Sequence, residues 1–154
     1  MKPIKHILCP VDFSGSSDEA LHYAIQIAVS SSAAIHLVHV MPRPNSYDWM
    51  TGMYMLLTDD TFKKAKKEAA EKLAALAQEL KVNHPSLSIT TKMDDSDDPA
   101  GGILSEAKAY HTDLIIMGSH GRKGLDRLLM GSVAESVMRH TTCDVLIYKK
   151  GASL

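Results

Sequence analysis

The sequence predicts a single α/β domain built on a doubly wound open sheet of five mostly parallel strands with four helices. Five short segments rich in apolar and β-branched residues alternate with four segments whose apolar residues recur at helical spacing. The apolar runs are nearly continuous, which is typical of parallel strands covered on both faces by helices on right-handed crossovers. A length of 154 residues with 45% apolar content fits one domain over residues 1–154.

The first strand is predicted at residues 4–11, an apolar, β-rich run that ends in a cluster of turn-forming residues. Ser16 and Glu19 then have the spacing of a capping box. Apolar residues at helical spacing continue to Val29. We therefore expect the first helix to begin at Ser16 and to bury a stripe that includes Val29.

The second strand is predicted at residues 34–40 and ends before a loop that contains Pro42 and Pro44. Over residues 62–80, apolar side chains step by threes and fours while Lys and Glu side chains pair on the opposite face. This pattern predicts a long, half-solvated second helix. Residues 87–93 alternate apolar with polar side chains, which predicts a third strand at an edge of the sheet.

Asp98 and Pro99 have the features of an N-cap and a first helical residue, which predicts the third helix. The fourth strand follows at residues 113–117. Ser132 and Glu135 form a second capping box, which predicts a fourth helix with Val133, Ala134, Val137 and Met138 facing inward. The last strand is predicted at residues 145–148.

The segment after the fourth strand has the features of a phosphate-binding loop. Spaced glycines permit close backbone approach and positive φ, so that consecutive N–H groups can converge on an anion. The loop leads into a helix, whose N-terminus favours negative charge. The spacing matches neither the P-loop nor the Rossmann fingerprint. The loop residues are Gly118, Ser119, His120 and Gly121, followed by Gly131, Ser132 and Val133.

In open α/β sheets, ligands bind at the carboxyl ends of the strands, where the winding direction reverses. If the first and fourth strands are neighbours, Asp12 faces the glycine loop. The Asp12 carboxylate would then accept hydrogen bonds from ribose hydroxyls or hold a phosphate-bound divalent cation. The structural alternative is an Asp that stabilises the turn after its strand.

These residues carry a resemblance to a known family. Over residues 4–149 the sequence resembles the universal stress proteins, and it is most similar to their ATP-binding branch. The Gly-x2-Gly-x9-Gly-Ser/Thr signature of that branch is matched by Gly118, Gly121, Gly131 and Ser132. The resemblance implies an adenine nucleotide alpha-hydrolase-like fold with strand order 3-2-1-4-5. It also implies a homodimer through the last strand, residues 145–148.

The resemblance further implies where ATP or AMP would lie, with Mg²⁺ as a possible companion of the phosphates. The adenine would meet backbone near Val11 and Val40, and the ribose would meet Asp12 and Gly118. The phosphates would meet the two halves of the glycine loop. The complete set of implied nucleotide-binding residues is Pro10, Val11, Asp12, Val40, Met117, Gly118, Ser119, His120, Gly121, Gly131, Ser132 and Val133.

Several of the loop residues have a structural alternative to a ligand role. The Ser132 hydroxyl can cap the fourth helix or bind a phosphate oxygen. His120 can donate to a phosphate or be an ordinary turn residue. Arg122 and Arg127 are either phosphate partners or solvated loop cations.

Other segments leave similar alternatives open. The acidic residues 94–98 could hold a divalent ion, but they also lead into a helix N-terminus that favours negative charge. The Met-rich residues 49–55 could cover the nucleotide or pack under a long loop. The serine-rich residues 14–18 resemble part of the loop of adenylating enzymes, although helix capping explains them more simply.

The bulk composition excludes some functions. Seventeen basic against eighteen acidic residues give a net charge of −1, which argues against nucleic-acid and anionic-membrane partners. Cys9 and Cys143 form no C-x-x-C pair, and both are expected to be buried and inert. The apolar run near the N-terminus is too short for a signal sequence or a membrane span, so a cytoplasmic location is expected.

Together these observations predict a nucleotide-binding stress-response or signalling protein with little or no fast catalysis. No catalytic base or metal-ligand cluster is visible at local spacing, so no catalytic residue is assigned, and slow ATP hydrolysis remains open. Two alternatives stand beside this hypothesis. One is an adenylating or nucleotide-hydrolysing enzyme that uses residues 14–18 and Asp12, and the other is a nucleotide-free interaction module.

Overall fold

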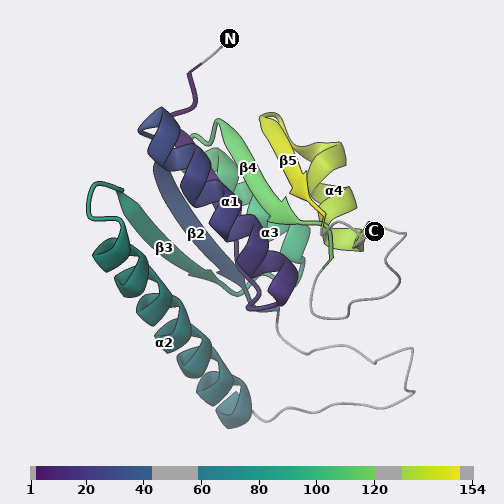
Figure 1. Cartoon of the computed structure of the whole chain (residues 1–154). Helices are drawn as coiled ribbons and strands as arrows, with labels where there is room; N and C mark the ends of the chain where they lie inside the picture. Colours follow the sequence, from purple (N-terminus) through teal and green to yellow (C-terminus); the bar gives the residue numbers. More distant parts are fainter. Residues whose placement is uncertain (1–2, 43–58, 121–129, 150–154) are drawn as a thin grey trace, which may run out of the picture.

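The computed structural model describes residues 3–42, 59–120 and 130–149. Five strands form one parallel sheet of order β3-β2-β1-β4-β5, as predicted, with four helices between them (Figure 1). The elements are β1 (His6–Pro10), α1 (Gly15–Ser31), β2 (Ala34–Val40), α2 (Asp59–Asn83), β3 (Ile89–Asp94), α3 (Pro99–Ala109), β4 (Leu114–Gly118), α4 (Ser132–His140) and β5 (Asp144–Tyr148).

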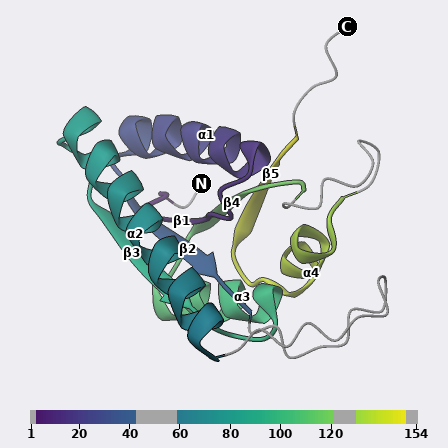
Figure 2. The ribbon, with the colours of Figure 1, turned by 90° about the horizontal axis from the view of Figure 1, so that it is seen from below.

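The sheet lies between two layers of helices. Helices α1 and α2 cover one face and α3 and α4 the other, as Figure 2 shows from below. Each face of the sheet has its own hydrophobic core, and alternate residues of a central strand pack into one or the other. Ile7 and Cys9 pack with α1 and α2, whereas Leu8 packs with α3 and α4. Burial on both faces explains why the sequence of these strands is almost continuously apolar.

The winding direction reverses between β1 and β4. The chain moves from β1 outward to β2 and β3, then crosses to β4 on the other side of β1 and continues to β5. Ligands of such sheets bind at the carboxyl ends of the two strands at this point. Here Val11 and Asp12 follow β1, and Ser119 follows β4.

Two predicted helix starts are wrong. The N-cap of α1 is Ser14, not Ser16, because Ser14 has the extended backbone of a cap and its hydroxyl oxygen accepts the Ser17 N–H at 3.3 Å. The N-cap of α4 is Gly131, so Ser132 is the first helical residue and not the cap. The start of α3 is as predicted, with Asp98 accepting the Ala100 N–H at 3.1 Å.

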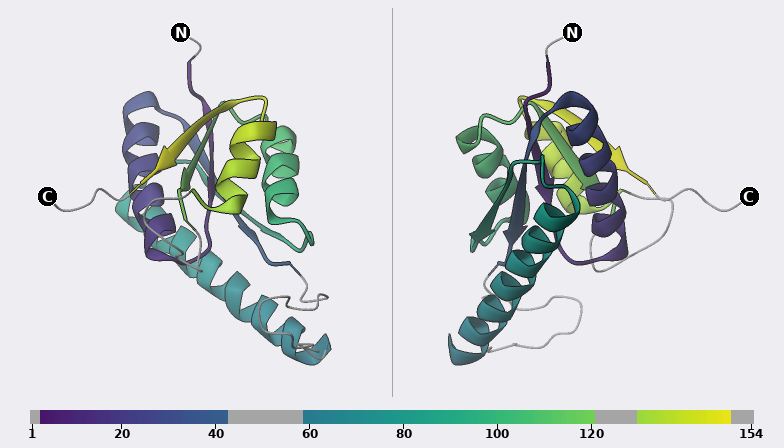
Figure 3. Two further views of the ribbon diagram at one scale, coloured as in Figure 1. Left: turned by 90° about the vertical axis from the view of Figure 1, so that its right-hand side faces the viewer. Right: turned by 60° about the vertical axis from the view of Figure 1, so that its left-hand side comes forward.

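Two side chains expected in the core are exposed. Val29 is 51% exposed and Met138 is 46% exposed, whereas the preceding residues Ala28 and Val137 are fully buried. Successive residues lie 100° apart around a helix, so only one of each pair faces the sheet. Helix α2 is long and extends beyond the sheet, as both views in Figure 3 show. Within the described part of the chain, no helix is long and apolar enough to cross a membrane.

Candidate functional site

The two halves of the predicted glycine loop meet at Ser119. Its N–H donates to the Tyr148 carbonyl at the end of β5 (2.8 Å), and its own carbonyl accepts the Gly131 N–H (2.7 Å). Ser119 is only 4% exposed. Its buried backbone therefore fixes the N-terminus of α4 against the carboxyl end of β4.

Gly118 brings β4 against the start of α1. A Cβ atom at Gly118 would lie 2.9 Å from the carbonyl oxygen of Ser16 and 3.0 Å from its carbonyl carbon. Such distances are too short for a real side chain, so only glycine fits here. This approach places the end of β4, the first turn of α1 and the β1–α1 turn beside one another.

The N-terminus of α4 has unused hydrogen-bond donors. In the described part of the chain, the N–H groups of Ser132, Val133 and Ala134 have no hydrogen-bond partner, and Gly131 offers no side-chain cap. The acidic residue of the first turn does not reach back, because the Glu135 carboxylate accepts from the Arg139 guanidinium at 2.9–3.0 Å. Uncapped N–H groups at a positive helix end favour an anion.

Asp12 takes the structural role that was left open for it. Its Oδ1 accepts hydrogen bonds from the N–H (2.9 Å) and the hydroxyl (2.5 Å) of Ser14, and its own N–H donates to the Ser17 hydroxyl (3.2 Å). The carboxylate is partly buried. Asp12 therefore orders the turn that leads into α1, at the position where the resemblance implies a ribose contact.

His39 was missed by the sequence analysis. It is 4% exposed, and its Nδ1 donates to the Val11 carbonyl at 2.6 Å, while the Val11 N–H donates to the Val38 carbonyl at 2.8 Å. The ring also packs on Phe13, whose φ of 61° is left-handed (centroids 4.9 Å apart). The available signal was a histidine inside an otherwise apolar strand.

Of the remaining predicted site residues, Val40, Met117 and Val133 pack into the core on the α3–α4 face, whereas Pro10 and His120 are partly buried. Pro10 is the last residue of β1. The side chain of Val40 packs on Gly102 of α3: a Cβ atom added at Gly102 would lie 3.2 Å from each of the Val40 methyl groups. Met117 is 6% exposed and Val133 is partly buried in the α3–α4 core. His120 Nδ1 lies 2.8 Å from the Ser119 hydroxyl.

The acidic run after β3 has structural partners. Asp94 accepts the Ser96 N–H (2.7 Å), Asp95 pairs with Lys66 (2.9 Å) and Asp98 caps α3. A search of residues 3–42, 59–120 and 130–149 finds no group of three or more His, Cys, Asp or Glu side chains that could hold a metal ion. Gly121, Arg122, Arg127 and the Met-rich residues 49–55 lie outside the described residues.

The two cysteines differ. Cys9 is fully buried, as predicted, and desolvation raises the pKa of its thiol from 9.0 to about 12. Cys143 is only partly buried, so the prediction of a buried thiol is wrong for this residue. It lies in the turn before β5, at the opposite end of the sheet from the switch point.

Comparison with known proteins agrees with this architecture. The model of the universal stress protein family matches residues 3–149. Universal stress protein MJ0531 of Methanocaldococcus jannaschii is 34% identical over 95% of this chain and 82% of its own length. Universal stress protein A homolog 1 of Coxiella burnetii is 31% identical over 92% of this chain and 94% of its own.

Solved structures share the fold. The universal stress protein UspA of Lactobacillus plantarum superposes with a TM-score of 0.77 at 24% identity, covering 96% of this chain and 99% of its own. A universal stress protein solved in complex with cAMP gives a TM-score of 0.57 at 21% identity, covering 96% of this chain and 98% of its own.

Proposed function

Since this chain belongs to the universal stress protein family, we propose that it binds an adenine nucleotide, ATP or AMP, and acts in a stress response by sensing or signalling rather than by fast catalysis. The proposed site is the carboxyl edge of the sheet between β1 and β4. The observation that carries the proposal is the uncapped N-terminus of α4, which is fixed beside the end of β4 by the hydrogen bond from Gly131 to Ser119.

The phosphates would bind the N–H groups of Ser132, Val133 and Ala134, and the exposed Ser132 hydroxyl would add a fourth donor. The Gly131 N–H is excluded from this role because it already donates to Ser119. Support for a nucleotide in this fold comes from the relative solved with cAMP.

The nucleoside would lie over the ends of β1 and β2. The Val11 carbonyl keeps a second lone pair beside its bond to His39 and would accept from the adenine amino group. The ribose would lie against the Asp12 turn. Mg²⁺ would be held mainly by phosphate oxygens and water, since it requires only one or two protein carboxylates when phosphates are present.

Isothermal titration calorimetry with ATP and AMP, with and without magnesium, tests this proposal. A Ser132→Asp variant places a carboxylate among the free N–H groups and should weaken ATP binding about tenfold. An acidic residue in the first turn stabilises a helix, so weaker binding would not reflect unfolding. Ser88→Asp changes the net charge equally at an exposed position outside the site and serves as control.

Two results would overturn the proposal. One is the absence of binding by the unmodified protein at about 1 mM nucleotide, with or without magnesium. The other is an equal effect of the two Asp variants.

We also propose a homodimer through the exposed edge of β5, residues 145–148.

A further inference from the structure

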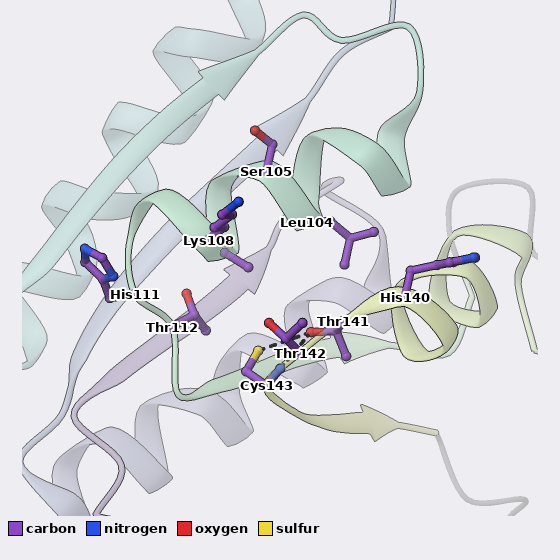
Figure 4. A pocket seen from close by; sticks show the side chains of 10 residues that line it. Leu104, Ser105, Lys108, His111, Thr112, His140, Thr141, Thr142 and Cys143 are labelled. Carbon is purple, nitrogen blue, oxygen red and sulfur yellow. Dashed lines mark hydrogen bonds between the residues drawn. The ribbon is translucent and has the colours of Figure 1, made fainter.

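A cavity lies at the opposite end of the sheet from the proposed nucleotide site. It has a volume of about 470 Å³ and lies between the last turns of α3 and α4, beside the turns that lead into β4 and β5 (Figure 4). The residues that line it include three potential cations, a run of threonines and Cys143, but no carboxylate. The proposed function does not use this cavity.

An unpartnered hydroxyl lies in the wall of the cavity. Thr112 is 9% exposed, and among the described residues its Oγ1 has no hydrogen-bond partner, while its N–H is held by the Ala107 carbonyl at 2.9 Å. In Figure 4 this hydroxyl points from the α3–β4 turn toward the side of the cavity on which Lys108 lies. A buried hydroxyl without a partner is unfavourable, which indicates a partner from outside the chain.

Cys143 lines the same cavity with its sulfur next to a donor. The Thr141 hydroxyl oxygen accepts the Cys143 N–H at 3.2 Å and lies 3.2 Å from the Cys143 Sγ. Because the oxygen already accepts from that N–H, its own hydrogen can be donated to the sulfur. The sulfur lies in the wall of the cavity and is only partly buried, so a soluble reagent can reach it.

The rim of the cavity carries one lysine and two histidines. Lys108, His111 and His140 line it from the ends of α3 and α4. The acidic residues adjacent to the lining in sequence lie outside it, and two of them have other partners: Glu106 is bonded to His36, and Asp113 accepts from the backbone of residues 5 and 6. Lys108, in the last turn of α3, also offsets the negative C-terminal end of that helix, which would otherwise repel an anion. A thiol reagent that carries carboxylates would therefore be attracted to Cys143.

We propose that Cys143 is a site of thiol–disulfide exchange with an anionic, low-molecular-weight disulfide that binds in this cavity. The Cys143 thiol loses its proton to water, and the thiolate attacks one sulfur of the small disulfide. A bond forms between the protein and that sulfur, while the other half leaves as a thiolate and takes up a proton. The Thr112 hydroxyl and the basic rim hold the polar groups of the attached half.

The full-length protein is incubated with glutathione disulfide, the anionic probe, and the products are identified by intact mass and peptide mapping. We expect a single adduct on Cys143 that a reductant removes and that Cys143→Ser abolishes. Cys9 is an internal control, because it is fully buried and its thiol pKa of about 12 keeps it protonated. Failure to form an adduct, or equal modification of both cysteines in the native protein, would overturn the proposal.

A second measurement separates a built site from a merely exposed thiol. We compare the rates with glutathione disulfide and with cystamine, a cationic disulfide, each relative to a free cysteine peptide. Cys143 should prefer the anionic probe by about fivefold, the factor that one exposed charge contact of ~1 kcal/mol gives. Lys108→Glu should remove this preference, whereas Lys81→Glu, in the last turn of α2, should not.

Thr112→Val provides an isosteric test of the unpartnered hydroxyl. It should slow the reaction with glutathione disulfide without lowering stability, because no hydrogen bond within the described chain is lost. No preference for the anionic probe, or unchanged rates in both Lys108→Glu and Thr112→Val, would show that no ligand site surrounds Cys143. None of these measurements depends on nucleotide binding.

Discussion

Gly118 has a packing role that is separate from any contact with phosphate. Its backbone is not left-handed, so its lack of a side chain, not its φ, explains why glycine stands there. Gly118→Ala forces a Cβ against the carbonyl group of Ser16 and should destabilise the protein by about 1–3 kcal/mol. Urea denaturation of the unliganded protein measures this cost.

Gly15→Ala is the matched control, because a Cβ at Gly15 meets nothing within 4 Å. It should be neutral or slightly stabilising, since alanine reduces the entropy of the unfolded chain. Equal stability of the two variants would contradict the packing explanation.

Asp12 shows why the position of a site residue was easier to predict than the partner of its side chain. The sequence correctly predicts that Asp12 follows a central strand, and the switch point beside β4 is where it was expected. The partner of its carboxylate was left open, because the choice between a ligand and the Ser14 N–H depends on the fold of the turn. His39 was missed for a related reason: its bond to the Val11 carbonyl joins two strands that are separated in sequence.

At the scale of elements, His36 connects the edge strand β3 and helix α3 to the centre of the sheet. Its Nδ1 lies 2.7 Å from the Thr90 hydroxyl on β3, and its Nε2 lies 2.8 Å from the Glu106 carboxylate on α3. The ring also stacks on Tyr110, with centroids 4.4 Å apart. His36 itself is 6% exposed, so both ring nitrogens depend on these partners.

Glu106→Ala leaves the buried imidazole without one of its partners and should lower the free energy of unfolding by about 1–3 kcal/mol. Glu71→Ala is the control, because Glu71 pairs with Lys67 only at 4.0 Å on the exposed face of α2. That change should cost less than about 0.5 kcal/mol. Denaturant titration measures both, and hydrogen exchange should show faster exchange in β3 only for Glu106→Ala. Indistinguishable variants would rule out this role for His36.

The order and type of the elements were predictable because each carries a local hydrophobic period. The residues at which the helices begin were harder to predict. Serines at 14, 16 and 17 can all cap a helix, and the hydrogen bonds between Asp12 and Ser14 favour the first. At α4, Glu135 pairs with Arg139 one turn later instead of completing the predicted capping box. In each case a contact outside the motif decides the boundary.

At the scale of the whole molecule, the sheet has two edges of different character. Local periodicity did not specify which strands are neighbours, and the order was predicted only through the family resemblance. The edge strand β3 carries exposed polar residues, including Thr90, Thr91 and Lys92, whereas β5 presents half-buried apolar residues over 145–148. Polar edges resist pairing, so β5 is the edge suited to a second copy of the chain.

A proline scan of the two edges tests the proposed dimer. The Tyr148 carbonyl points toward β4, so the N–H of the preceding residue, 147, points outward from the sheet. The Ser88 carbonyl points toward β2, so the N–H of residue 91, three positions later, points outward from β3. Ile147→Pro therefore removes an outward donor without removing a bond to β4, and Thr91→Pro is the equivalent change at the other edge. Sedimentation velocity should give twice the 16.8 kDa chain mass for the unmodified protein and for Thr91→Pro.

Ile147→Pro should sediment as a monomer, with circular dichroism confirming that the fold is kept. Loss of the dimer in both variants, or persistence of the dimer in Ile147→Pro, would contradict pairing through β5. Nucleotide binding by a folded monomeric Ile147→Pro variant would further show that the proposed site is complete within one chain, because its groups at the ends of β1, β4 and α4 all come from the same copy.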